Sequence, residues 1–130
     1  MLEQMVLLTA ERTSLTIGTD LFLGYEDEDT VDAVVVREAS PGVPNPDLTD
    51  QWMGVVQFLS NHHDMWTART RAFEIFAALN GVYNITLPTI EGQDDIYAHS
   101  IIASGTPFSV GMDERRVHTY SCTMYVTVQT

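Results

Sequence analysis

Apolar residues recur at helical spacing in two parts of the chain. Leu2, Met5, Val6 and Leu8 predict a short amphipathic helix over Leu2–Arg12. A second helix is predicted to begin after Asn61 or Asp64, either of which would cap it by accepting a backbone hydrogen bond, and to stop at Asn80 and Gly81. Its predicted core face consists of Ala68, Ala72, Ile75, Phe76 and Leu79, and a flanking apolar stripe consists of Trp66, Phe73 and Ala77.

Strand-like patterns occupy residues 20–25, 31–39, 51–60, 96–104 and 117–128. The last of these alternates most clearly, because its even positions are His118, Tyr120, Cys122, Met124, Val126 and Val128. Period-two alternation of this length predicts a strand with one buried face. The order of elements predicts one α+β domain over residues 1–130. Its sheet is expected to be antiparallel or mixed, with about five strands and two helices packed on one face.

Two segments are predicted to be loops. Residues 40–50 contain Pro41, Pro44 and Pro46, and this density of proline argues against a place inside a sheet. Because strands are expected on both sides, we predict a proline-bearing loop that projects as the arm of a long hairpin. Residues 105–116 carry prolines, glycines and charges and are predicted to form the second loop.

The charge balance narrows the classes of partner. The formal net charge is −12, and all six basic residues are arginines. Such a chain lacks the clustered basic residues with which proteins grip nucleic acid, and an anionic membrane surface would repel it. The single cysteine cannot form an internal disulfide, and neither a signal peptide nor a long apolar run is evident. We therefore expect a soluble protein that is intracellular when made and has no membrane partner.

Few residues suggest chemistry. His62, His63 and Asp64 are adjacent, and exposed side chains at a helix start explain them better than a metal site. His118 and Cys122 share a strand face, but four residues of strand separate them by about 13 Å, too far for a nucleophile and its base. The sequence has no phosphate-binding loop, nucleophile elbow or C-x-x-C pair. We expect neither an enzyme nor a bound cofactor or metal.

Two charged segments remain open. The acidic run consists of Glu26, Asp27, Glu28 and Asp29. It lacks the ligand spacing of an EF-hand, and a solvated loop is the simpler interpretation. Residues 113–116 would suit a charged turn before a strand, with ion pairs inside one subunit or between subunits.

Three stretches together resemble the tail terminator proteins of long-tailed bacteriophages, a group that includes minor capsid and head–tail joining proteins. The first is the valine-rich strand that leads into the proline-bearing loop, and the second is residues 55–59 followed by the helix to Leu79. The third is the turn before the closing strand, where Pro107, Gly111, Asp113 and Arg116 stand at matching positions. The resemblance covers most of the chain.

The resemblance implies a structural virion protein that caps the tail tube as a homohexameric ring. Such a ring stops tube polymerisation, contacts the tail tube protein and the head-completion protein, and lets genomic DNA pass without specific binding. The protein would be assembled in the host cytoplasm and reside in the virion, at the head–tail interface. Alternatives are another component of the same joint, either a head-completion or a tail-tube subunit, or a small acidic ligand-binding domain.

A ring requires two different, complementary surfaces on each subunit. The candidate interface residues are Pro41, Pro44, Pro46, Trp66, Phe73, Asp113, Arg115 and Arg116. Trp66 and Phe73 have an alternative role, which is to complete the subunit's own core. The candidate residues for the lining of the channel are Glu26, Asp27, Glu28 and Asp29.

Overall fold

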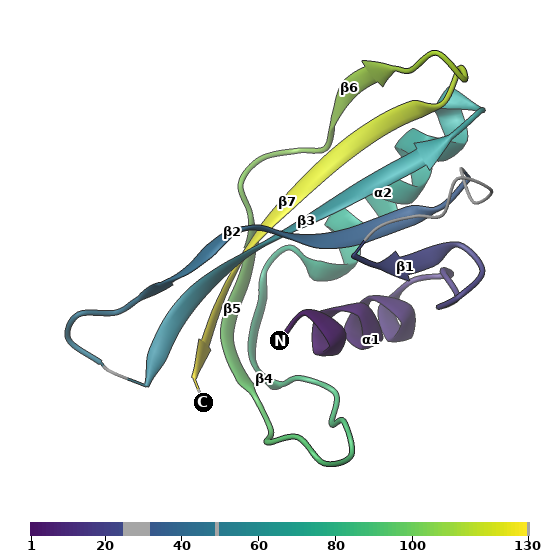
Figure 1. The fold of residues 1–130 in the computed structure, drawn as a ribbon. Coiled ribbons are helices and arrows are strands. Elements are labelled where there is room, and N and C mark those ends of the chain that lie inside the picture. Colours follow the sequence, from purple (N-terminus) through teal and green to yellow (C-terminus); the bar gives the residue numbers. More distant parts are fainter. Residues whose placement is uncertain (25–31, 49, 130) are drawn as a thin grey trace.

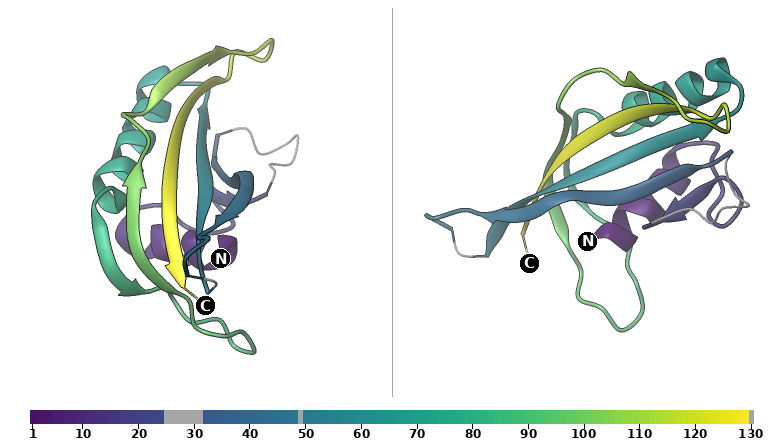
Figure 2. Two further views of the ribbon diagram at one scale, coloured as in Figure 1. Left: turned by 90° about the vertical axis from the view of Figure 1, so that its left-hand side faces the viewer. Right: turned by 45° about the horizontal axis from the view of Figure 1, so that its top comes forward.

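A computed structural model of the protein describes residues 1–24, 32–48 and 50–129, which build a curled mixed sheet and two helices (Figure 1). In chain order the elements are α1 (Leu2–Arg12), β1 (Leu21–Leu23), β2 (Val34–Pro44), β3 (Gln51–His62), α2 (Met65–Leu79), β4 (Val82–Thr86), β5 (Tyr97–Ala103), β6 (Phe108–Met112) and β7 (His118–Gln129). The turned views of Figure 2 show how strongly the sheet curves.

The sheet is organised around its two longest strands, β3 and β7. They pair antiparallel over their whole length, from Gln51 opposite Gln129 to His62 opposite His118. The strand order is β1-β2-β3-β7-β5-β4, and β6 pairs with β7 outside this path. Among the strand pairs of the described residues, β1 and β2 run parallel and all the others run antiparallel. The edge of β7 that faces away from β3 is therefore shared, with β5 paired along one end and β6 along the other.

The core lies on one face of the β3–β7 ladder. Alternate residues point into it because side chains on a strand alternate between the two faces of the sheet. Its inward residues on β3 and β7 are Val56, Phe58, Cys122, Met124, Val126 and Val128, all fully or almost fully buried. Met5, Val6 and Leu8 of α1 and Ile75 and Leu79 of α2 belong to the same buried cluster. The predicted alternation of the closing strand is confirmed from Cys122 to Val128.

The helices follow the periodicity in the sequence. The bounds of α1 equal the predicted ones, and Ala68, Ala72, Ile75 and Leu79 are buried on α2 while Phe76 packs partly against the core. Asp64, one of the two predicted caps, is the N-cap residue of α2, but its side chain makes no capping hydrogen bond to a backbone N–H. The Asp64 carboxylate instead accepts a hydrogen bond from the Thr67 hydroxyl at 2.7 Å. Neither helix is both long and apolar enough to cross a membrane.

The prediction that residues 40–50 form a loop is wrong for the first half of the segment. Strand β2 continues to Pro44, with register shifts between Glu38 and Ser40 and between Ser40 and Val43. Proline has no N–H to donate to a strand ladder. It is therefore tolerated mainly at such irregularities and on edge strands, where no donor is needed. Beyond Val36, β2 has no described partner on its outer side. The hairpin of β2 and β3 projects beyond the rest of the sheet (Figure 1).

The number of strands also exceeds the prediction, because β4 and β6 were not expected. Each has only five residues, and each lies at a free edge of the sheet. β4 follows Gly81 directly, and its Asn84 has a positive φ of 54° that interrupts strand geometry. β6 lies inside the segment predicted as the loop 105–116. Pairing with a long neighbouring strand stabilises such short strands. The local sequence does not predict this pairing, because strand propensity depends on tertiary context.

The buried ring of Phe58 provides a test of the core. Phe58 is completely buried and lies opposite Cys122 at the middle of the ladder. We expect Phe58→Ala to lower the free energy of unfolding by about 3–5 kcal/mol, because it leaves a cavity in the core. Urea denaturation measures this loss. The aromatic control Trp66→Ala, at a side chain that is 65% exposed, should change stability by less than about 0.5 kcal/mol. Equal losses in the two variants would contradict this account of the core.

Candidate functional site

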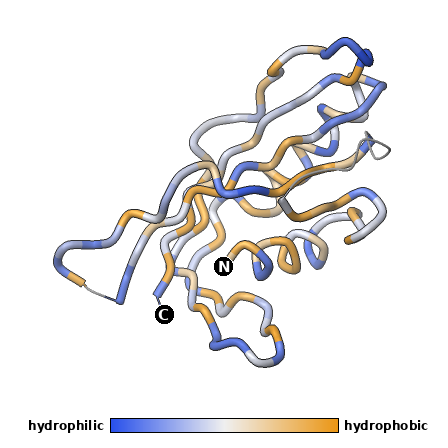
Figure 3. The backbone as a smooth tube through the Cα atoms, viewed as in Figure 1, coloured by the Kyte–Doolittle hydropathy of each residue, from blue (hydrophilic) through white to orange (hydrophobic). Residues whose placement is uncertain are grey.

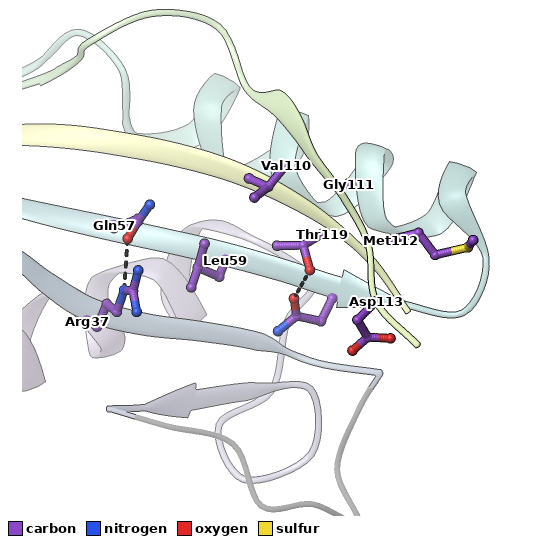
Figure 4. Close-up of a pocket in the computed structure, with 9 residues that line it drawn as sticks. Arg37, Gln57, Leu59, Val110, Gly111, Met112, Asp113 and Thr119 are labelled. Carbon is purple, nitrogen blue, oxygen red and sulfur yellow. Dashed lines mark hydrogen bonds between the residues drawn. The ribbon is translucent and has the colours of Figure 1, made fainter. Parts of the chain in front are cut away.

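The outward face of the β3–β7 ladder carries a groove of about 450 Å³ between β2 and β6. Its lining residues are Arg37, Gln57, Leu59, Asn61, Val110, Gly111, Met112, Asp113 and Thr119. Figure 4 shows Arg37 and Gln57 at one end of the groove and Asp113 at the other, with Leu59 and Val110 between them. The groove therefore has an apolar middle and polar ends, and it is open to solvent.

Hydrogen bonds hold the polar floor of the groove in place. Arg37 Nε donates to Gln57 Oε1 at 2.8 Å, and Gln57 Nε2 donates to the buried Ser121 hydroxyl at 2.9 Å. Thr119 donates its hydroxyl proton to Asn61 Oδ1 at 2.6 Å. This network fixes the Arg37 side chain through its Nε. Among the described residues, no hydrogen bond or ion pair reaches its two terminal nitrogens, so they can receive an anionic group.

Strand β6 is a short edge strand that exposes three large apolar side chains. Phe108, Val110 and Met112 are 58%, 59% and 57% exposed. Within the part of the chain that is described, β6 pairs only with β7, so its other edge presents unpaired backbone groups. The strand contains neither proline nor charge, the usual protections of a free edge. An unprotected apolar edge of this kind is typical of a surface that another chain covers.

The charged turn between β6 and β7 is stabilised from within the subunit. Asp113 Oδ1 accepts the backbone N–H groups of Arg115 and Val117 at 2.9 and 3.0 Å, and Arg115 Nη2 lies 3.1 Å from Asp113 Oδ2. The Val117 N–H and, after it, the contacts with Arg115 hold the pKa of Asp113 below its ordinary value near 3.8. Of the two readings left open by the sequence, an ion pair inside the subunit accounts for Asp113 and Arg115. Figure 3 shows this turn as a strongly hydrophilic segment at the top of the view.

Arg116 occupies a different position in the turn. Its φ is 62°, and its backbone N–H donates to the Asp113 carbonyl. Its side chain is exposed, and the described residues provide no ion pair for it.

The candidate stripe on α2 divides into an exposed and a half-buried part. Trp66 is 65% exposed and is not part of the buried cluster, so it contributes little to the subunit's own core. Phe73 is half-buried, with its ring centroid 6.2 Å from that of Phe76, and the Arg69 guanidinium lies 4.5 Å above it. Trp66 is therefore available to a partner, whereas Phe73 is largely occupied within the subunit.

The arm formed by β2 and β3 carries the three candidate prolines. Pro41 and Pro44 lie in β2 and are exposed, and Pro46 lies at the tip. A side chain at Gly42 would place its Cβ 2.8 Å from the Trp52 ring, so glycine allows the two strands of the arm to approach. The structure thus places the arm prolines and the α2–β6 residues on different surfaces.

The remaining candidates do not form a chemical site. Glu26, Asp27, Glu28 and Asp29 lie outside the described residues. His63 Nδ1 lies 2.8 Å from Asp32 Oδ1, while His62 Nδ1 is 3.9 Å from the same oxygen. Partial burial alone would raise the pKa of Asp32, but hydrogen bonds from His63 and the neighbouring imidazoles hold it below its ordinary value. Within the described ranges, no three potential ligands gather around a common metal position.

Cys122 is enclosed by the core. Burial raises the pKa of its thiol to about 11, which disfavours the reactive thiolate.

The sequence contained a signal for β6 that its surroundings obscured. Phe108, Val110 and Met112 alternate with small residues, which is a strand pattern. The prolines, glycines and charges around them favoured a loop. Arg37 and Gln57 offered no signal at all, because only strand pairing brings these two polar residues of different strands together.

The sequence matches no protein-family model and no curated protein.

The turn at Asp113 provides a test of its ion pair. Because its pKa is lower in the folded state, the ionised carboxylate stabilises the fold above the unfolded value near 3.8, and this stabilisation is lost as pH falls through the folded value. We expect Asp113→Asn to lower the melting temperature at neutral pH. The difference from the original chain should shrink below about pH 3.8. Thermal melting followed by circular dichroism between pH 2 and 7 measures it.

Glu114→Gln removes one negative charge from the same turn and is the matched control. A difference for Asp113→Asn that stays constant down to pH 2 would contradict the assigned role of the carboxylate.

Proposed function

We propose that this protein is a phage tail terminator, a structural subunit that closes into a ring, most simply a hexamer, on the end of the tail tube. In this role it stops polymerisation of the tube protein and presents a surface to the head-completion protein. The proposal combines the resemblance of three stretches of sequence with the surfaces that the subunit exposes. It assigns the protein an assembly role rather than catalysis.

The observation that carries the proposal is the exposed apolar edge at β6. Three large apolar side chains, each more than half exposed, are unfavourable on an isolated soluble subunit and favourable in an interface. Trp66, on α2, adds a further exposed aromatic side chain of the kind enriched in the centres of interfaces. These features support a subunit that is buried against partners when it functions.

The arm supports the same proposal from a different surface. A ring is built from heterologous contacts, in which one surface of a subunit meets a different surface of the next. The β2–β3 arm extends away from β6 and α2, so the subunit has two separate surfaces of this kind (Figure 1). The proposal also includes the packing of both helices on one face of the sheet, as the order of elements in the sequence predicts. The shared buried cluster of α1 and α2 supports that arrangement.

A second candidate function is ligand binding in the groove beside Arg37. The groove combines apolar side chains with a few polar groups, which is the usual composition of a small-molecule site. Native mass spectrometry of the purified protein distinguishes the two functions, because a bound small molecule adds mass to the monomer whereas a ring multiplies it. A head-completion or tail-tube subunit would also assemble, but its removal would have a different effect on tail length.

Removal of the protein tests the proposed function. We expect phage assembly without this chain to produce tails of excessive or heterogeneous length that are not joined to heads, because nothing then stops polymerisation of the tube protein. Electron microscopy of negatively stained lysates measures the lengths. Supplying the chain separately should restore uniform tails joined to heads. Uniform tails of normal length in its absence would rule the proposal out.

The acidic segment provides a separate test of the channel. The chain has a net charge of −12, and acidic residues lining a ring would repel passing DNA and prevent it from adhering. We propose Glu26, Asp27, Glu28 and Asp29 for this lining and expect their replacement by Gln and Asn to slow DNA ejection. Release of DNA from purified particles, followed by dye fluorescence, measures the rate. Unchanged ejection would argue against this segment as the lining.

A further inference from the structure

We propose that the tip of the β2–β3 arm of one copy docks into the groove beside Arg37 of the next copy. The tip consists of Asn45, Pro46, Asp47, Leu48 and Asp50. This inference rests on the proposed function, since it names the contact that joins neighbouring subunits. It assigns partners to two surfaces that the isolated subunit leaves open.

The groove offers an anchor for an apolar side chain and one for an anion. Leu59 and Val110 form its middle, where a branched aliphatic side chain would lose its contact with water. Arg37 is held at one end through its Nε, and its terminal nitrogens have no described partner. At the other end, the charge of Asp113 is already matched by Arg115. The unmatched charge of the groove is therefore positive.

The tip carries the complementary groups. Leu48 is 52% exposed, and Asp47 beside it has no described partner for its carboxylate. Asp50 is also acidic, although its Oδ2 accepts a hydrogen bond from Gln129. The described tip has no basic residue. A leucine next to a free carboxylate matches a groove with an apolar middle and a free guanidinium at its end.

Hydrogen bonds within the arm hold the described residues of the tip in place before it binds. Asn45 donates from Nδ2 to Gln51 Oε1 at 2.8 Å, and its Oδ1 accepts the Asp47 N–H at 2.9 Å. The Gln51 N–H closes the turn by donating to the Leu48 carbonyl at 3.1 Å. Pro46 further restricts the backbone. A segment fixed in this way loses little conformational entropy on docking, which favours its use as a connector.

The groove that receives the tip must belong to another copy. Gln51, next to the tip, and Gln57, in the groove, lie on the same extended strand, so about 20 Å of rigid backbone separates them. The tip cannot fold back across this distance into its own groove. A contact between the tip of one copy and the groove of the next is directional, and such contacts generate rings when the rotation closes.

Charge selects a second copy as the occupant rather than nucleic acid. Copies that carry −12 each repel one another, and a cation of one copy placed against an anion of the other offsets part of this repulsion. Arg37 and Asp47 provide such a pair. Nucleic acid would need several clustered cations, and Arg37 is the only unmatched cation among the residues that line the groove.

Cysteine crosslinking tests the geometry of this contact. In a Cys122→Ser background, we expect the combination of Leu48→Cys and Met112→Cys to give, on mild oxidation, a ladder of covalent species that extends beyond the dimer. Each single variant can form dimers at most. Met112 lines the groove and is 57% exposed, so it can be reached without unfolding. Leu48→Cys combined with Tyr83→Cys on β4, which is 56% exposed and outside the groove, is the matched control.

Charge reversal tests the energetics. Arg37→Glu should raise the protein concentration at half-assembly by about tenfold or more in sedimentation velocity. Asp47→Arg added to Arg37→Glu should restore most of the assembly. Arg12→Glu makes the same change in net charge away from both surfaces and should leave assembly unchanged. Thermal melts of all variants separate loss of docking from loss of fold.

The outcomes distinguish the docking from the proposed function. Rings of the original chain, a ladder from the double cysteine variant and rescue by the reversed pair support both. If rings persist in Arg37→Glu and the double cysteine variant gives no ladder, the docking is overturned and the terminator ring is left intact. A small molecule retained in the groove also overturns the docking. A chain that stays monomeric at every concentration and in isolated particles overturns both.

Discussion

The antiparallel ladder between β3 and β7 is the constraint on which the rest of the structure depends. It pairs two twelve-residue strands in one continuous register, and every other strand except β1 and β4 attaches directly to one of them. Because side chains alternate along a strand, this register sends Val56, Phe58 and Met124 into the core and turns Gln57, Leu59 and Thr119 outward. A slip of one residue would exchange the two faces, so the ladder determines the core and the groove together.

The same ladder explains why the subunit has two distant surfaces. At one end β3 continues with β2 into the arm, and at the other it leads into α2, next to the turn between β6 and β7. A rigid double strand keeps the tip of the arm and the groove apart within one copy, while it presents both to other copies. This geometry suits a protein that functions as part of a ring, and it connects the proposed docking with the proposed termination of the tail tube.

The sequence predicted those elements whose local pattern and burial agree. Helix α1 and the core face of α2 followed from apolar spacing, and the closing strand followed from its alternation, because these side chains meet a single apolar surface. Prediction failed where pairing compensated for unfavourable local signals. Pro41 lies in β2 because a bulge on a free edge accommodates it, and β6 forms within a loop-like segment because β7 lies beside it. At the start of α2, the Asp64 carboxylate accepts a hydrogen bond from the Thr67 hydroxyl, a side-chain pairing that the cap prediction did not include.

The sequence by itself therefore determined the buried faces of the two helices and of the closing strand from Cys122 to Val128, and that the chain carries a large negative charge on a single small domain. Only the tertiary structure decided which exposed residues act together. Arg37 and Val110 belong to strands far apart in the chain, and they line one groove because β2 and β6 attach to opposite sides of the same ladder. The physical reason is that burial depends on each residue's own affinity for water, whereas a surface site depends on long-range strand register, which no local pattern encodes.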